Sequence, residues 1–309
     1  MTALFNSRKF YSGALVGIDI SGDVLNPSTL FTEYKNRVVA DGGTIIDEAA
    51  TLNEITFLVN NGMWERVSAW AGASFGLKIR SGTTTQVDKL YGLAGSPDFV
   101  AVAVATSGAP PIAFTPAAAG SPNKLAIVLS GGGVYLKSSV TTKAQAAVGV
   151  PYLLSARLED RLATDQLGIT VSFSDPTTNK ALAQQHTILT NGGVINEAWQ
   201  FFATNVNPPV TGSDVGSGAQ SPYSAFANCA GLIDPLAGKV IGYGNGAVLH
   251  TGTSSTGSLA DLSNVSGYWH LGPANSAVPT GQSCYGYLAN IRCLNIASAL
   301  DAQLISSRA

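Results

Sequence analysis

The sequence predicts a mainly β protein, an antiparallel β-sandwich with a small helical N-terminal segment and a short C-terminal helix. From about residue 75 onward, short apolar runs alternate with clusters of Gly, Pro, Asn and Ser, which is typical of antiparallel strands joined by turns. Residues 287–294 alternate like a strand with one buried face. Apolar residues at helical spacing are concentrated before residue 75 and at the C-terminal end.

Two short helices are predicted in the N-terminal part. Asn26-Pro27 can begin the first, because proline in the first turn needs no partner for an N–H, and Asp41-Gly42-Gly43 ends it. Asp47 can cap the second helix, which ends at 60–62. The expected buried face of the first helix consists of Leu30, Tyr34 and Val38. That of the second consists of Leu52, Ile55 and Val59, with Leu58 flanking it.

We expect residues 1–75 to form an attachment or oligomerisation segment and residues 76–309 to form the sandwich domain. A strand that opens on aromatics at Gly267, a second strand over 286–294 and a short amphipathic helix over 297–305 complete the chain. Loops of more than about twelve residues are usually functional or ordered against a neighbouring subunit. The predicted long loops, rich in Gly or Pro, cover 109–122, 205–224 and 251–258.

The composition suits a subunit whose surface is covered by neighbours. Charged residues make up 12% of the 309 residues, about half the usual share. The net charge is -2 with no block of Lys or Arg, so we expect no nucleic-acid partner. No apolar run approaches the ~20 residues of a membrane-spanning helix, and the first residues lack a secretory segment. We therefore expect that the protein does not insert into a membrane. We also expect that it is synthesised in the cytosol.

Three cysteines, Cys229, Cys284 and Cys293, are too few and too scattered for a disulfide scaffold or a zinc site. Cys284 and Cys293 could face each other across a hairpin. Reduced thiols are the favoured interpretation, because a protein made in the cytosol keeps its thiols free.

No catalytic residues are predicted. Glycoside hydrolysis needs two positioned carboxyl groups, and the one dense acidic cluster, Glu159-Asp160 with Asp165, is flanked by Arg157 and Arg161. That pattern is typical of a solvated charged turn. A hydrolase acting through Glu159 or Glu197 is the weakest of the alternatives.

No cofactor or metal is predicted either. The three histidines, His186, His250 and His270, stand singly, without a second ligand at metal spacing. A Ca²⁺ ion is an alternative, because hard cations take oxygen ligands from loops, although the same residue types also build turns. The oxygen ligands for such an ion would come from Asp234, Asp261, Asn264 and Asn275.

Aromatic residues supply the candidate contact site. A sugar ring can stack its C–H face on an aromatic ring, but most rings in a β-sandwich belong to the core. His270 beside Trp269 is also typical of a packed or interface position. The candidate glycan or interface contacts, with the two tyrosines first, are Tyr243, Tyr268, Trp269 and His270.

Two stretches resemble known families. The C-terminal order of Gly267-Tyr-Trp-His-Leu, Gly286-Tyr-Leu-Ala-Asn-Ile-Arg and the final helix resembles laminin-G-like, concanavalin-type jelly rolls, a family of sugar-binding and adhesive modules. The phrase Arg37-Val-Val-Ala-Asp-Gly-Gly43, with the strand pair Phe75–Gly82 and Val87–Leu93, resembles the leading part of tailed-bacteriophage virion proteins.

These resemblances imply a non-enzymatic virion structural protein, displayed as a tail-fibre, baseplate-associated or capsid-decoration subunit. The expected partners are other virion proteins and further copies of the chain. A homotrimer is one oligomeric state that this class implies. The expected location is the virion, assembled in the host cytoplasm. The alternative is a lectin-like module that recognises host surface glycans.

Overall fold

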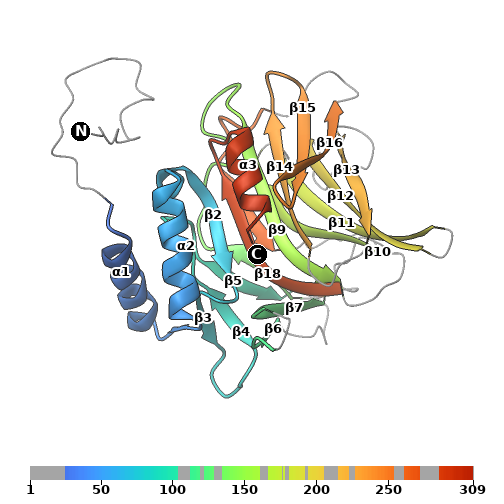
Figure 1. The fold of residues 1–309 in the computed structure, drawn as a ribbon. Coiled ribbons are helices and arrows are strands. Elements are labelled where there is room, and N and C mark those ends of the chain that lie inside the picture. The colour runs from blue at the N-terminus through green and yellow to red at the C-terminus, as the bar shows by residue number, and fades with distance from the viewer. Residues whose placement is uncertain are drawn as a thin grey trace, which may run out of the picture.

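The structure is a computed structural model. It describes residues 25–103, 112–118, 122–128, 134–160, 166–175, 177, 181–191, 194–204, 215–222, 227–253, 261–271 and 285–308. Two antiparallel sheets stack into a sandwich, and three α-helices pack against it (Figure 1). The expected fold class, an antiparallel β-sandwich with a helical N-terminal segment and a short C-terminal helix, is confirmed.

One sheet, here sheet A, has ten strands, and each pairs with its neighbour in antiparallel fashion. In spatial order they are β1 (Thr44–Ile45), β3 (Gly76–Ile79), β4 (Val87–Leu90), β5 (Phe99–Ala103), β8 (Val134–Ser138), β17 (Tyr268–Leu271), β10 (Gln166–Ser174), β11 (Ala181–Asn191), β12 (Val194–Thr204) and β13 (Val215–Pro222).

The second sheet, sheet B, is built around the long strand β18 (Tyr285–Leu294). The first half of β18 pairs with β7, its second half with β2, and its other edge with β9. The remaining strands of this sheet are β16 (Ala247–Thr253), β15 (Lys239–Gly244), β14 (Ala227–Asp234), β9 (Tyr152–Asp160), β7 (Lys124–Val128), β6 (Ala113–Thr115) and β2 (Val67–Gly72).

Strand alternation separates two apolar clusters. In β2, Ala69 and Ala71 face the core between the sheets, whereas Trp70 faces outward into a second cluster under the helices. The inter-sheet core is centred on large rings such as Trp269 and Phe173, whose centroids are 5.1 Å apart. Period-two alternation thus gives sheet B two apolar faces, and the outer one requires a cover.

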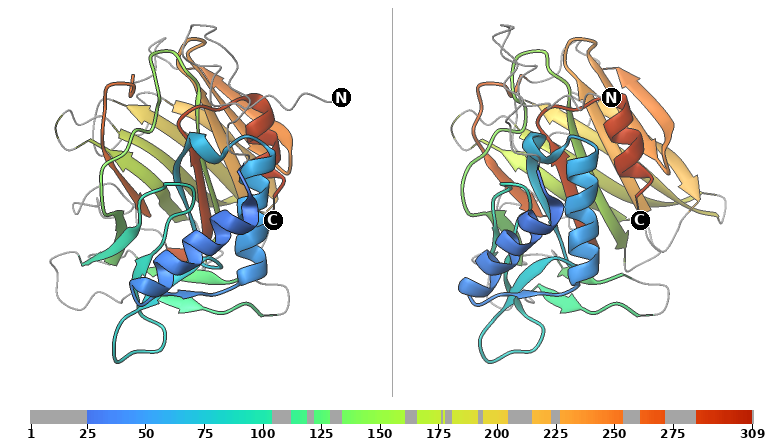
Figure 2. Two further views of the ribbon diagram at one scale, coloured as in Figure 1. Left: turned by 90° about the vertical axis from the view of Figure 1, so that its left-hand side faces the viewer. Right: turned by 60° about the vertical axis from the view of Figure 1, so that its left-hand side comes forward.

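The helices provide that cover. They are α1 (Pro27–Ala40), α2 (Glu48–Asn60) and α3 (Ala299–Ser306), with a short 3₁₀ turn at Trp64–Arg66. Figure 2 shows them gathered on one side of the sandwich. Side chains of all three, including Val38, Leu58 and Ile305, belong to the same cluster as Trp70. Among the described residues, no helix has the length and apolar character needed to cross a membrane.

The predicted helix starts are confirmed. The Asn26 side chain accepts hydrogen bonds from the first turn of α1, and Asp47 does so for α2. Ser298 and Asp301 form a reciprocal capping box at the start of α3. The predicted buried stripe of α2 is confirmed at Ile55 and at the flanking Leu58 but is wrong at Leu52 and Val59, which are only half-buried. The fully buried face consists of Thr51, Glu54, Ile55 and Leu58.

Three other predictions differ from the structure. The expected loop at 205–224 contains β13, whose Gly- and Ser-rich sequence carries no apolar alternation. The expected loops at 109–122 and 251–258 overlap β6 and the end of β16. Glu159 and Asp160 end strand β9 instead of forming a turn. In each case strand pairing with a neighbour overrides weak local preference.

The domain division at residue 75 stays a prediction. Strand β2 precedes that position in sequence, yet it pairs with β18 inside sheet B. The two N-terminal helices therefore pack on a sheet to which their own segment contributes a strand.

The end of α1 is attached to the β3–β4 side of sheet A by a charged group that we call the Asp41–Asp98 cluster: Arg37, Asp41, Lys89, Tyr91 and Asp98. Arg37 donates to Asp98 at 2.7 Å, and Lys89 Nζ lies 2.9 Å from both carboxylates. The Tyr91 hydroxyl donates to Asp41 at 2.7 Å. The virion-like phrase 37–43 thus has a role in folding, since it supplies two members of this cluster.

Candidate functional site

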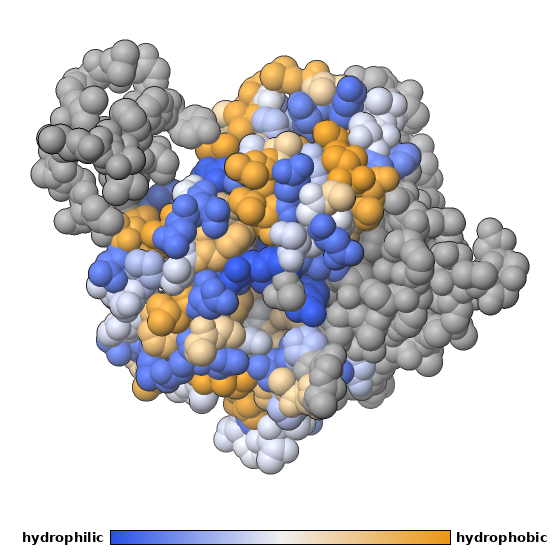
Figure 3. Space-filling model, viewed as in Figure 1, coloured by the Kyte–Doolittle hydropathy of each residue, from blue (hydrophilic) through white to orange (hydrophobic). Residues whose placement is uncertain are grey.

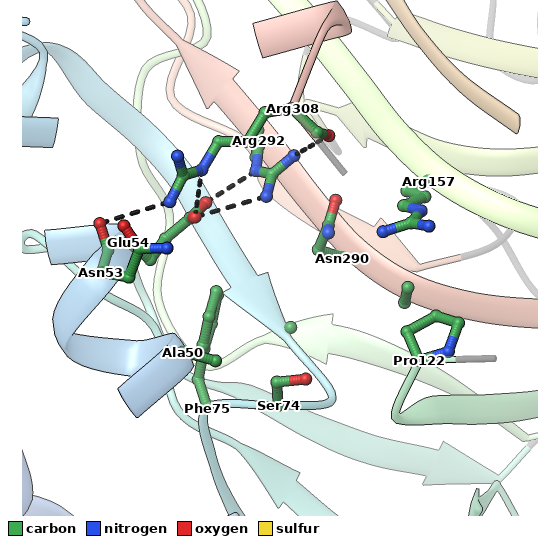
Figure 4. A pocket seen from close by; sticks show the side chains of 12 residues that line it. Ala50, Asn53, Glu54, Ser74, Phe75, Pro122, Arg157, Asn290, Arg292 and Arg308 are labelled. Atoms are coloured by element: carbon green, nitrogen blue, oxygen red, sulfur yellow. Dashed lines mark hydrogen bonds and ion pairs between the residues drawn. The ribbon is translucent and has the colours of Figure 1, made fainter. Parts of the chain in front are cut away.

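A pocket of about 140 Å³ lies on the outer face of sheet B, between α2, strands β2, β18 and β9, and the C-terminal residues (Figure 4). Its volume is comparable to a cavity that holds a single six-membered ring. In Figure 3, drawn from the same side as Figure 1, hydrophilic residues gather in the middle of this face, near the C-terminus. The lining residues are Ala50, Asn53, Glu54, Gly72, Ser74, Phe75, Pro122, Arg157, Ala289, Asn290, Arg292 and Arg308.

The floor of the pocket is a polar row across three neighbouring strands. Asn290 of β18 stands directly opposite Arg157 of β9 and Gly72 of β2. Arg292 lies two residues further along β18, so its side chain points to the same face as that of Asn290. A Cβ on Gly72 would lie 3.1 Å from the Cβ of Asn290, so the glycine leaves the space above the row open.

Glu54 of α2 reaches down onto this row and forms what we call the Glu54 cluster: Glu54, Trp70, Arg292 and Arg308. Arg292 Nε donates to one carboxylate oxygen and Arg308 Nε to the other, each at 2.7 Å. The indole N–H of Trp70 donates to the carboxylate at 2.9 Å. The side chains of Glu54 and Arg292 are only 4% and 3% exposed.

The protonation of Glu54 follows from these contacts. Burial alone would raise the pKa of its carboxyl group, but the charges and hydrogen bonds of Arg292 and Arg308 outweigh burial and hold the pKa below its ordinary value. Glu54 is therefore an ionised, fully engaged carboxylate that orients two guanidinium groups.

The C-terminal residues close one wall of the pocket. Arg308 also donates to the backbone oxygen of Asn53 at 3.2 Å, and its guanidinium lies 4.3 Å from the ring centre of Phe57. Its own carbonyl accepts from Arg292 and, at 2.7 Å, from the side chain of Asn228. The last turn of the chain is thus held in place by α2, β14 and β18 together.

Asn290 is the polar residue of the pocket with an unused group. Its side chain is largely buried, with 8% of the residue exposed, and its Oδ1 has no hydrogen-bond partner among the described residues. Burial, together with the charge of Arg292, lowers the pKa of Arg157 across the strand from it. The pocket therefore combines guanidinium donors with a buried, unpartnered amide acceptor, in surroundings of positive potential.

The residues singled out from the sequence lie elsewhere. Tyr268, Trp269 and His270 are consecutive on β17 in sheet A, whereas Tyr243 lies on β15 in sheet B. Tyr243 is buried in the helix-covered cluster. The structure therefore brings three of the four together and separates the fourth.

Within the β17 group, only Tyr268 is partly exposed, and Lys137 Nζ lies 3.7 Å from its ring centre. Trp269 is fully buried and donates its indole N–H to Thr142. Burial, with the charge of Lys137, lowers the pKa of His270 to about 3, so this imidazole is neutral at physiological pH. Tyr268 is thus the residue of the four whose ring could meet a sugar.

The pocket residues were not singled out from the sequence, although two signals existed. Asn290 and Arg292 interrupt an apolar strand on one face, and Glu54 stands inside the apolar stripe of a helix. Charged residues at such positions are rarely buried without a partner. If these two charged residues are assumed to be buried and paired with each other, the sequence points to Glu54 and Arg292.

Two of the candidate Ca²⁺ ligands have structural roles, and a third, Asn275, lies outside the described residues. Asp234 and Asp261 each accept a backbone N–H two or three residues ahead, as turn-forming side chains do. The described residues contain no group of three or more His, Cys, Asp or Glu side chains that could hold a metal ion. Cys229 and Cys293 are buried and form no disulfide with a described residue, and burial raises the pKa of Cys293 to about 12. Cys284 lies outside the described residues.

No protein-family model matches the chain, and no curated protein matches it in sequence. Among solved structures, a heptameric SAP-like pentraxin from Limulus polyphemus is similar to it, with a TM-score of 0.43, 15% identity, and coverage of 56% of this chain and 75% of the pentraxin.

Two further structures illustrate the range. A botulinum neurotoxin type C chain, whose cell entry depends upon interaction with two ganglioside molecules, has a TM-score of 0.45 and 10% identity over 80% of this chain. The match covers 52% of the neurotoxin chain, so this chain spans about half its length. Domain 4 of an extracellular arabinanase from Geobacillus stearothermophilus, in complex with arabinotriose, has a TM-score of 0.42 and 15% identity, over 70% of this chain and 91% of that one. Nothing in these comparisons points to a bacteriophage origin.

Proposed function

We propose that this protein is a carbohydrate-binding module and that the pocket on the outer face of sheet B is its binding site. The observation that carries the proposal is the meeting of guanidinium donors with the unpartnered Asn290 oxygen in a space that fits one ring. Sugar hydroxyl groups both donate and accept hydrogen bonds, so such a pocket can satisfy several of them at once.

Binding rather than hydrolysis is supported by the carboxylates of the pocket. Among the described residues that line it there is a single carboxylate, Glu54, which is ionised and engaged by two arginines and Trp70. A glycosidase needs a second carboxyl group and a protonated acid at its reacting bond. The pocket lining offers neither.

A glycan array probed with the labelled full-length chain tests this proposal. We expect the chain to bind a limited set of glycans and Asn290→Ala to lose this binding. Asn264→Ala is the matched control and should retain binding, because it removes the side chain of an exposed asparagine in the turn before β17. Tyr268→Ala, tested in parallel, measures whether the β17 aromatic contributes. A folded protein that binds no glycan would overturn the proposal.

The second candidate is the virion structural subunit implied by the sequence resemblance. Exposed apolar side chains favour it: Leu236, 83% exposed, packs over Gly149, next to Val148, which is 71% exposed. Apolar side chains that cluster on a surface commonly mark contact with another protein. Light scattering should then give a homo-oligomer that Leu236→Asp dissociates, and antibodies should label phage particles. A monomeric chain absent from purified particles would refute this candidate.

A further inference from the structure

The charge of the pocket restricts its ligand beyond carbohydrate in general. The described lining residues include three arginines and one glutamate, a net formal charge of +2, whereas the whole chain carries -2. The positive charge is therefore local to this site. Neutral sugars gain nothing specific from such an excess, while an oxyanion gains charge-assisted hydrogen bonds.

The donors of Arg308 are only partly used inside the protein. Its Nε is engaged by Glu54 and one terminal nitrogen by the Asn53 carbonyl, and its other terminal nitrogen has no hydrogen-bond partner among the described residues. The Arg308 side chain is 20% exposed, against 3% for Arg292. Arg308 is thus the guanidinium best able to meet a ligand, and Glu54 and Phe57 hold it in position.

The Asn290 oxygen requires a second feature in the ligand. It is an acceptor, so it cannot bind a carboxylate or sulfate oxygen, and it needs an O–H or N–H group instead. A simple fully ionised anion would leave it unsatisfied. One ring that carries both an oxyanion and neighbouring hydroxyl groups would satisfy Arg308 and Asn290 together.

We propose, resting on the carbohydrate-binding function above, that the pocket recognises an acidic sugar unit: Arg308 donates to its oxyanion, and Asn290 accepts from an adjacent hydroxyl. Glu54 and Arg292 act as positioning residues, because their mutual ion pair orients Arg308 and the floor of the pocket. The shared chemistry is an oxyanion on a sugar ring, which a uronate carboxylate or a sulfate ester can supply.

Calorimetry with the full chain and matched oligosaccharides tests this inference. The probes are three short oligosaccharides of equal length that end in glucose, glucuronate or glucose 6-sulfate. We expect at least one acidic probe to bind about tenfold or more tightly than the neutral one, with an advantage that shrinks as NaCl rises from about 50 mM to about 500 mM. The stronger of the two acidic probes identifies the oxyanion.

Two variants test the site itself. Asn290→Asp keeps the shape but places a negative charge beside the oxyanion, without touching the ion pairs of Glu54, and Arg308→Gln removes the principal donor. Both should abolish the acidic preference, Asn290→Asp by repelling the oxyanion and Arg308→Gln by removing its donor. Arg80→Gln is the matched control, since it removes the same charge from an exposed pair with Asp88 on the β3–β4 hairpin. Thermal melting establishes that each variant is folded.

The outcomes separate the two proposals. Equal binding of neutral and acidic probes, or an acidic preference that survives Asn290→Asp and Arg308→Gln, would overturn the acidic-sugar inference and leave carbohydrate binding standing. Failure of the folded chain to bind any probe or array glycan would overturn the proposed function and the inference with it.

Discussion

Two charged clusters attach the N-terminal helices to the sandwich, and they differ in burial. In the Asp41–Asp98 cluster at the end of α1, the Asp41 and Arg37 side chains are each 46% exposed. In the Glu54 cluster under α2, Glu54 and Arg292 are almost completely enclosed. Exposed ion pairs are screened by water and contribute little, whereas a buried charge depends entirely on its partners.

The difference explains why the pocket lies beside one cluster and not the other. The buried carboxylate fixes the arginines with strong, unscreened hydrogen bonds, so their remaining donors are held in position before a ligand arrives. The exposed cluster instead fixes a helix end, and its donors and acceptors largely satisfy one another. We therefore expect the arginines of the Glu54 cluster, and not Arg37 of the Asp41–Asp98 cluster, to be preorganised for binding.

The largest effect should come from breaking the buried cluster. Glu54→Gln leaves the buried charge of Arg292 without its counter-charge, and we expect a loss of about 3–5 kcal/mol in the free energy of unfolding. Urea denaturation followed by tryptophan fluorescence measures it. Glu48→Gln, on the same helix but in an exposed pair with Lys35, is the control and should change stability by less than about 0.5 kcal/mol. Equal effects of the two variants would contradict the comparison.

A steric change at the end of α1 should have the next largest effect. A Cβ on Gly43 would lie 2.4 Å from a carbon of the Tyr91 ring, which is fully buried and held by Asp41. Gly43→Ala should therefore cost about 1–3 kcal/mol through overpacking. Thermal melting checks this, and an unchanged melting temperature would mean that the helix end moves aside freely.

Acid titration should distinguish the clusters by their carboxylates. The pKa of Glu54 is held below 4.5 in the folded protein, so its contribution is fully present above the unfolded pKa and is lost as pH falls through the folded pKa. The stability difference between the wild type and Glu54→Gln should stay constant from neutral pH to about 4.5 and then shrink by up to about 1.4 kcal/mol per pH unit. A difference that begins to shrink near pH 6 would contradict this assignment.

The smallest effect is expected at Asp41. Hydrogen bonds from Lys89 and Tyr91, with the charge of Lys89, lower the pKa of Asp41 to about 2, but the group is exposed to solvent. Asp41→Asn should leave the urea midpoint unchanged within error, at low and at high NaCl alike. A clear salt-dependent loss would show that exposed pairs contribute more here than the comparison assumes.

Much of the architecture followed from local patterns. The sequence correctly predicted the starts of α1 and α2, at Asn26-Pro27 and Asp47, and the aromatic start of β17. Caps, turns and period-two alternation act through near neighbours in sequence. Strand β13 was not foreseen, since its Gly- and Ser-rich residues are extended by pairing with β12 rather than by preference. The stripe of α2 was predicted wrongly at Leu52 and Val59, because hydrogen bonds let the polar Thr51 and Glu54 occupy the buried positions instead.

The candidate site was the part of the molecule that local sequence patterns predicted least well. Tyr243 and Tyr268 share a residue type and an alternating context, yet one is buried under helices and the other is partly exposed. Glu54, Arg157, Arg292 and Arg308 are separated by as many as 254 residues along the chain. Their convergence depends on which strands pair and on where the last turn of the chain lies.

The sequence by itself determined the sandwich, its helical ends and the caps that bound them, because these depend on side-chain periodicity and on backbone groups close in the chain. Only the tertiary structure decided that a lone glutamate would be buried between two arginines, and that an asparagine oxygen beside them would lack a partner. The physical reason is that burial of charge is a property of the assembled surroundings: a carboxylate is buried only where distant segments bring it enough opposite charge.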